Sequence, residues 1–205
     1  MRVLFISGSL WHGSYNTALL REAANALPRV VDHEWLDGIA GLPPYDEDDN
    51  GERPPAAAQR LCRTIAAADA VLIATPEYNG SIPGGLKNAV DWASHPFPDN
   101  AWRDKPVAVI GASTGIFGAI WAQAELRKSL GLAGARVIDV ELAVGAAQEA
   151  FLPSGGLRDP GLATGLRYVV AELVDAHLGR ELELVELFRQ PHGFEGLGAI
   201  PVDLN

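Results

Sequence analysis

The sequence predicts one doubly wound α/β domain in which a five-stranded parallel sheet carries helices on both faces. Three observations support this fold class. Short apolar runs alternate with segments whose apolar residues recur at helical spacing. The chain has 205 residues, a length that one α/β core with an extension can use. Hydrophobic residues make up 48% of the chain and charged residues 20%, as in ordinary globular proteins.

Five apolar runs are expected to form the strands. The first, Val3-Leu4-Phe5-Ile6, is continuously apolar and is closed by Ser7-Gly8-Ser9, which is typical of a strand buried on both faces of a parallel sheet. The runs Val71-Leu72-Ile73-Ala74 and Val107-Ala108-Val109-Ile110 have the same character. The expected strands cover residues 3–6, 30–35, 71–74, 107–110 and 136–140.

Helices are expected after each strand. In the first, Leu19, Leu20, Ala23 and Leu27 lie on one face, and Pro28 ends the helix because its ring cannot continue it. The expected helices cover residues 16–27, 56–68, 86–93, 117–130 and 162–177. Because strands and helices alternate, right-handed crossovers predict a parallel sheet with strand order 2-1-3-4-5.

Two segments fall outside this alternation. The loop at residues 42–55 is long, acidic and rich in proline, and we consider it either a lid or a solvated connector. Residues 180–205 carry apolar side chains at 182, 184, 185, 187 and 188 and continue with a proline and glycines that break regular structure. We therefore divide the chain into a domain at 1–179 and a C-terminal extension at 180–205. Because apolar side chains need a surface to cover, we expect the extension to pack on the domain or on a partner subunit.

The charge and the cysteine content narrow the possible functions. A net charge of −10 argues against broad binding to nucleic acid or to an anionic membrane, so local dipoles must hold any anionic ligand. No apolar run approaches the roughly 18 residues of a membrane helix. Cys62 is the only cysteine, which excludes an intrachain disulfide and a cysteine-based metal cage. We expect a cytoplasmic protein.

Ligands of doubly wound sheets bind beyond the carboxyl ends of the strands, which makes the loops after strands one, three and four the candidate site. The first loop, residues 8–16, offers hydroxyls, a side-chain amide and backbone N–H groups at the start of a helix. Such a helix terminus holds a phosphate without a basic patch. The alternative is that Ser14 or Asn16 only caps the helix. The candidate binding residues of this loop are Ser9, Trp11, His12, Ser14, Tyr15 and Asn16.

The second and third loops are also unusual in composition. Two prolines and three glycines between residues 76 and 85 favour an irregular backbone whose amides can bind the polar edge of a planar ring. Tyr78 is suited to covering part of a ring face. The third loop, residues 111–115, allows close backbone approach and adds hydroxyls. The candidate residues of the two loops are Pro76, Glu77, Tyr78, Asn79, Ser113, Thr114 and Gly115.

These loops resemble those of the NAD(P)H-dependent FMN reductases, a family that includes chromate and quinone reductases and azoreductase-like enzymes. The similarity is closest over residues 75–92, beginning Thr-Pro-Glu-Tyr-Asn-Gly, and covers roughly residues 1–178. It extends to Gly8-Ser9, Gly13-Ser14 and Asn16, to Leu42-Pro43-Pro44-Tyr45-Asp46, and to Lys105-Pro106 with residues 111–115.

The resemblance implies a flavodoxin-like fold at residues 1–179, bound FMN, and a homodimer or homotetramer with the flavin near a subunit interface. It places Ser9, Ser14 and Asn16 at the FMN phosphate, residues 76–79 at the isoalloxazine ring, and residues 113–115 at the other edge of that ring. One departure stands out. The family usually has Arg two residues after the Gly-Ser pair, where this sequence has Trp11-His12. His12 cannot replace that charge in full at physiological pH.

The expected function is hydride transfer from NADPH or NADH through FMN to a small acceptor such as a flavin, quinone, chromate or azo compound. The flavin supplies this chemistry, so no catalytic side chain and no metal are expected. Two alternatives stay open. One is a flavodoxin-like carrier that exchanges single electrons with protein partners, and the other is a flavin-free module that acts through its C-terminal extension.

Overall fold

The computed structural model describes residues 1–51, 54–153 and 155–189, with side chains described as far as residue 179. A single parallel sheet forms the centre of this part of the chain, in the order β2-β1-β3-β4-β5, and β6 pairs with the far end of β4. The predicted order 2-1-3-4-5 is therefore confirmed. The strands are β1 (Arg2–Ser7), β2 (Asp32–Trp35), β3 (Ala70–Thr75), β4 (Pro106–Ala112), β5 (Arg136–Val137) and β6 (Ala143–Val144).

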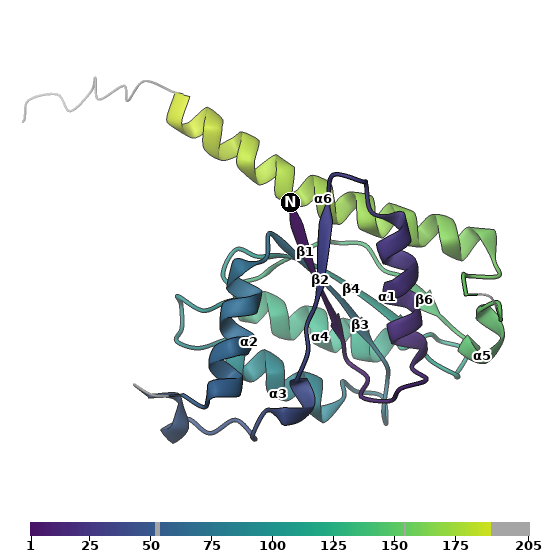
Figure 1. Cartoon of the computed structure of the whole chain (residues 1–205), viewed down its shortest axis with the longest axis horizontal. Helices are drawn as coiled ribbons and strands as arrows, with labels where there is room; N and C mark the ends of the chain where they lie inside the picture. Colours follow the sequence, from purple (N-terminus) through teal and green to yellow (C-terminus); the bar gives the residue numbers. More distant parts are fainter. Residues whose placement is uncertain (52–53, 154, 190–205) are drawn as a thin grey trace, which may run out of the picture.

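Helices cover both faces of the sheet, as Figure 1 shows. One face packs against α1 (Tyr15–Ala26) and α6 (Pro160–Arg189), and the opposite face packs against α2 (Ala56–Ala67), α3 (Gly84–Ala93) and α4 (Ile120–Leu132). Strands β3 and β4 are buried along their whole length, which explains their continuously apolar sequences. Shorter elements are η1 (Ile39–Gly41), η2 (Asp48–Asn50) and α5 (Ala147–Ala150).

The fifth position of the sheet differs from the prediction. Instead of one strand at residues 136–140, two short strands occupy it: β5 pairs with the start of β4 and β6 with its end. Between these strands, Asp139 and Val140 are bound by Arg127 of α4 instead, which donates to the Asp139 carboxylate and to the Val140 carbonyl oxygen, each at 2.8 Å. The sheet therefore has six strands rather than the predicted five.

Two other boundaries were predicted too early in the chain. Strand β2 begins at Asp32 rather than at residue 30, because the amide of Val31 donates to the Pro28 carbonyl oxygen in a turn. Helix α4 begins at Ile120 rather than at residue 117, because Gly118 and Ala119 have left-handed backbones with φ of 60° and 66°.

The last helix crosses the predicted boundary between domain and extension. Helix α6 runs from Pro160 to Arg189, so residues 180–189 continue the helix that packs on the sheet. Residues 190–205 lie outside the described part of the chain, and the expected packing of the extension stays a prediction. None of the helices in the described residues is long and apolar enough to cross a membrane.

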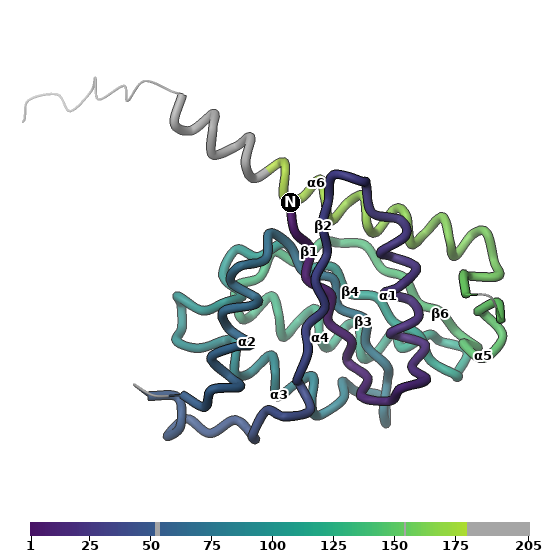
Figure 2. Tube along the Cα trace, viewed as in Figure 1, coloured from purple at the N-terminus to yellow at the C-terminus, as the bar shows by residue number. Residues whose placement is uncertain are grey.

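The loops that follow β1, β3 and β4 lie at one end of the sheet, along the lower edge of the view in Figure 2. Parallel strands require this, because their carboxyl ends all point the same way. The three loops predicted to form the site are thus neighbours.

Candidate functional site

Strand register brings the three loops to the same level. Ser7 at the end of β1 pairs with Ala74 of β3, and Thr75 pairs with Gly111 of β4. Gly8 then passes directly over β3, where its amide donates to the Ala74 carbonyl oxygen at 2.8 Å. A Cβ at Gly8 would lie 2.7 Å from Leu86 Cδ2, so any larger residue there would require the Leu86 side chain to shift.

The first loop presents backbone N–H groups at the start of α1. Ser14 is the N-cap: its Oγ accepts from the amides of Asn16 at 3.2 Å and Thr17 at 3.3 Å. Ser9 Oγ accepts from the Trp11 amide at 3.3 Å. In the described part of the chain, the amides of Leu10, His12, Gly13 and Tyr15 have no acceptor. The capping alternative for Ser14 is therefore realised, and the loop still offers unpaired donors to an anion.

Asn16 links the first loop to the third. Its side chain is buried, its Nδ2 donates to the Ala112 carbonyl oxygen, and its Oδ1 accepts from the Ala112 amide, both at 2.9 Å. Both ends of the side-chain amide are thus used on the end of β4. Asn16 orders the loop that was predicted to bind phosphate, and its side chain points to β4.

An aromatic wall borders the first loop. Trp11 is 62% exposed and its ring meets Tyr15 edge-on, with centroids 6.2 Å apart. Tyr15 in turn stacks on Phe151 at 5.8 Å. The Trp11 ring lies over Gly13, where a Cβ would come within 2.6 Å of it. His12 is exposed.

The second loop forms a tight hairpin that displays Tyr78. Tyr78 and Ser81 exchange two backbone hydrogen bonds of 3.1 Å, and Asn79 and Gly80 between them have left-handed backbones with φ of 55° and 74°. Tyr78, the first residue of the hairpin, is 55% exposed, whereas Pro76 before it is buried. Glu77 was predicted to meet the ring, but its carboxylate lies at the start of α4, where Oε2 accepts two backbone amides.

The third loop is held by β6 and the residues that follow it. The Ser113 amide donates to the Val144 carbonyl oxygen, and the Ala146 amide to the Gly115 carbonyl oxygen, each at 3.0 Å. Ser113 Oγ donates to the Gly115 carbonyl oxygen at 3.3 Å, and Thr114 is exposed. Sequence reasoning missed this support because β6 spans only two residues.

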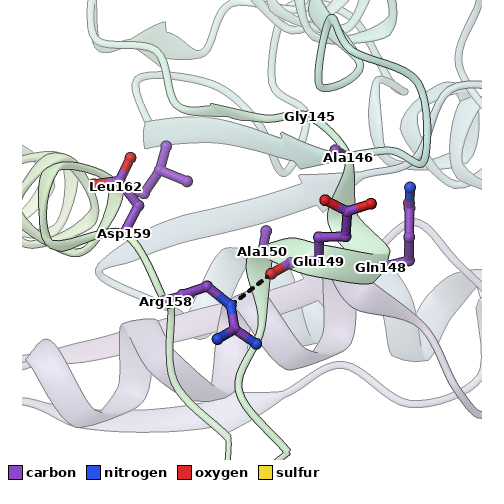
Figure 3. A pocket seen from close by; sticks show the side chains of 8 residues that line it. All are labelled: Gly145, Ala146, Gln148, Glu149, Ala150, Arg158, Asp159 and Leu162. Carbon is purple, nitrogen blue, oxygen red and sulfur yellow. Dashed lines mark hydrogen bonds between the residues drawn. The ribbon is translucent and has the colours of Figure 1, made fainter.

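A hollow adjoins the third loop beyond β6 (Figure 3). Its volume is about 570 Å³, and Ala146, which bonds to Gly115, is one of its walls. Arg158 Nε donates to the Glu149 carbonyl oxygen at 3.0 Å, and no carboxylate of the described residues forms an ion pair with this guanidinium. The sequence analysis did not single out Arg158.

Large apolar side chains surround the three loops without being covered by the described chain. Each is at least half exposed, far more than core residues of the same types. An exposed apolar group of this kind is typical of a binding surface for a flat ligand or a partner. The residues are Leu10, Trp11, Tyr78, Ile116, Phe117 and Trp121.

Comparison with known proteins identifies the family of this chain. The sequence profile of the NADPH-dependent FMN reductases matches residues 1–149. The chain belongs to this family. It is 46% identical over 160 residues to an NAD(P)H-dependent FMN reductase of Pseudomonas aeruginosa, covering 78% of this chain and 85% of that protein. It is 39% identical over 140 residues to a quinone reductase of Escherichia coli, covering 68% of this chain and 74% of that protein.

Solved structures agree. The flavoenzyme FerB, an NAD(P)H:(acceptor) oxidoreductase from Paracoccus denitrificans, superimposes with a TM-score of 0.76 at 35% identity, covering 87% of this chain and 97% of that chain. A flavodoxin from Pseudomonas aeruginosa, at a TM-score of 0.53 and 19% identity over 87% of this chain and 100% of that chain, shares the fold alone. The chain is therefore an FMN-dependent NAD(P)H oxidoreductase with a flavodoxin-like fold, rather than a carrier flavodoxin.

The residues present fit FMN. Unpaired amides and hydroxyls at the start of α1 match a phosphate, and glycine at position 8 lets the first loop lie against the second. When bound, FMN accepts a hydride from a nicotinamide and passes electrons to an acceptor. The protein has to orient the ring, hold the phosphate and limit the access of water.

Proposed function

We propose that this FMN-dependent oxidoreductase reduces quinones. The observation that supports this substrate class best is the lining of the site. Loops 8–16, 75–83 and 113–119 contain no Lys or Arg, and the net charge of the chain is −10. Such a site disfavours an anionic oxidant such as chromate, because no cation of the loops offsets the repulsion. An uncharged planar oxidant meets no such barrier.

The exposed aromatic side chains favour the same substrate class. Tyr78 and Trp11 offer flat apolar faces on two different loops, and a quinone ring stacks well on such faces. Relatives with the same activity in their names support the proposal. They include a 2-hydroxy-1,4-benzoquinone reductase of a Burkholderia species, 42% identical over 127 residues that cover 62% of this chain and 68% of that protein.

We assign the binding residues as follows. Ser9, Ser14 and the unpaired amides of loop 8–16 hold the FMN phosphate. The backbone of residues 76–79 meets one edge of the isoalloxazine ring, and Ser113, Thr114 and Gly115 border the other. The access of water is limited by Trp11, His12, Tyr15 and Tyr78. Asn16 orders loop 8–16 through its hydrogen bonds to the end of β4.

We also propose that the chain forms a homodimer or homotetramer and acts in the cytoplasm. The exposed apolar side chains around the three loops support a partner subunit, because burying them against a second copy of the chain removes apolar surface from water. The free thiol of Cys62 and the use of NAD(P)H fit a reducing compartment.

Steady-state kinetics test the substrate class. The purified protein is expected to be yellow, to be bleached by NADPH, and to have a kcat/KM for an uncharged benzoquinone at least about tenfold above that for chromate, a difference that one unfavourable charge interaction accounts for. Equal or higher kcat/KM for chromate at low ionic strength would refute the quinone proposal. A colourless protein that gains no colour with added FMN would refute the flavin site itself.

A further inference from the structure

Helix α4 begins without a cap of its own. Its N-cap residue, Ala119, has no side-chain acceptor and a left-handed backbone with φ of 66°. The first amides of a helix need acceptors from outside the helix, and the positive end of the helix dipole favours a negative one. In α4 this acceptor has to come from another part of the chain.

Glu77 supplies it. The Oε2 atom of Glu77 accepts from the amide of Trp121 at 3.0 Å and from the amide of Ala122 at 3.1 Å. Glu77 belongs to the loop after β3, whereas α4 follows β4, so the contact joins two neighbouring loops across 44 residues of sequence. A carboxylate on two amides at a helix start is a charge-assisted contact, stronger than an ordinary cap.

A second contact fixes the direction of the hairpin along α4. Ser81 Oγ donates to Glu125 Oε2 at 2.7 Å, one turn beyond the amides that Glu77 binds. The hairpin is thus attached to α4 before Tyr78 by Glu77 and after it by Ser81. Tyr78 is displayed between these two attachments with 55% of its surface exposed.

The third loop connects β4 to the same helix. Ser113 and Gly115 are held at one end by Val144 and Ala146, and the chain reaches α4 at the other end. Glu77 holds the start of α4 against the second loop. The distance between residues 76–79 and residues 113–115 therefore depends on the Glu77 contact.

We propose that Glu77 is a positioning residue that sets the spacing between the second and third loops, and thereby the affinity of the slot between them for a flat ring. The inference rests on the proposed function, which places the isoalloxazine ring in this slot. The Glu77 side chain acts through helix α4, because its Oε2 atom accepts the two helix amides, and only the Glu77 backbone is assigned to the ring.

Two ligands separate an effect on the ring from an effect on the phosphate. FMN and riboflavin carry the same ring, and only FMN carries the phosphate. Fluorescence titration of the full chain freed of flavin gives the Kd of each. In Glu77→Ala we expect both Kd values to rise about tenfold, as for the loss of a helix cap, with an unchanged ratio between them. In Glu77→Gln, which keeps an acceptor without the charge, we expect a rise of about threefold.

Two further variants serve as controls. Ser9→Ala removes a hydroxyl of the phosphate loop and should weaken FMN binding more than riboflavin binding. Glu34→Ala removes a half-exposed carboxylate of β2 that pairs with Arg2 at 3.7 Å, and should leave both affinities unchanged. Hydrogen exchange without flavin adds an independent readout, because peptides that contain Trp121 and Ala122 should exchange faster in Glu77→Ala.

The outcomes distinguish this inference from the proposed function. Faster exchange with an unchanged riboflavin affinity would make Glu77 a helix cap alone and overturn the inference. If Glu77→Ala does not fold, the Glu77→Gln variant decides, and unchanged affinities there would overturn the inference as well. A wild-type chain that binds neither flavin would instead refute the proposed function.

Discussion

Replacing Asn16 with alanine tests whether the first loop is held in place by the end of β4. The variant removes a buried side-chain amide that makes two hydrogen bonds of 2.9 Å to the backbone of Ala112. The amide and the carbonyl oxygen of Ala112 then lose their partners. Each unpaired buried backbone group costs about 1–3 kcal/mol, so the two together predict a loss of roughly 2–6 kcal/mol in the free energy of unfolding.

Urea denaturation of the flavin-free protein, followed by far-UV circular dichroism, measures this loss. With an m-value of about 2 kcal/mol per molar urea, the midpoint should fall by about 1–3 M. Asn25→Ala is the matched control, because Asn25 is an exposed asparagine of the same helix whose side chain makes no hydrogen bond to another described residue. Its change should stay within about 0.5 kcal/mol.

The contrary result is specific. If Asn16→Ala lowered FMN affinity strongly and left the flavin-free stability within about 1 kcal/mol of the wild type, the Asn16 amide would be a phosphate ligand rather than a link to β4.

Three other predictions concern separate parts of the chain. Gly145→Ala should destabilise the protein strongly, because a Cβ there collides with the carbonyl oxygen of Ile116. Gly131→Ala in α4 meets open space. It should increase the free energy of unfolding by up to about 1 kcal/mol and so raise the melting temperature. Burial raises the pKa of the Tyr45 hydroxyl, so the stability that its neutral form contributes is complete below pH about 10 and is lost as the pH rises through the folded pKa. Denaturation curves above pH 10 should therefore show a steeper decline for the wild type than for Tyr45→Phe, and equal slopes would contradict the assignment. Burial likewise raises the pKa of the Cys62 thiol, so iodoacetamide should label it slowly at pH 8 and faster in urea, as mass spectrometry can measure.

The central strands could be predicted from sequence because they are buried on both faces. Strands β3 and β4 read as continuous apolar runs, and the structure buries every residue of both. The edges of the sheet were harder. Strand β6 is two residues long, and the side chain that interrupts the fifth position, Arg127, lies on a helix. The start of α4 was misplaced because periodicity does not reveal the left-handed backbone of Ala119.

The location of the site was predicted from loop composition, since prolines, glycines and hydroxyls follow the central strands. The hydrogen-bond partners of individual side chains in these loops were not predicted. Asn16 binds a residue 96 positions away, and Glu77 binds amides 44 and 45 positions away. Local sequence carries no signal for partners at such separations. Both residues were predicted to touch the ligand, which stays a prediction, and the structure adds hydrogen bonds from their side chains to the backbone of neighbouring elements.

The composition of loop 8–16, which we propose holds the FMN phosphate, also predicts how ionic strength should change the rates of FMN binding and release. Many anion sites are cationic and release their ligand when salt is added. Here neutral amides and hydroxyls form the loop, while the whole chain carries a charge of −10. The long-range field therefore repels an incoming anion, and salt screens that repulsion. Added salt should make FMN enter faster and leave at nearly the same rate, so that the holoenzyme is retained under conditions that strip a cationic site.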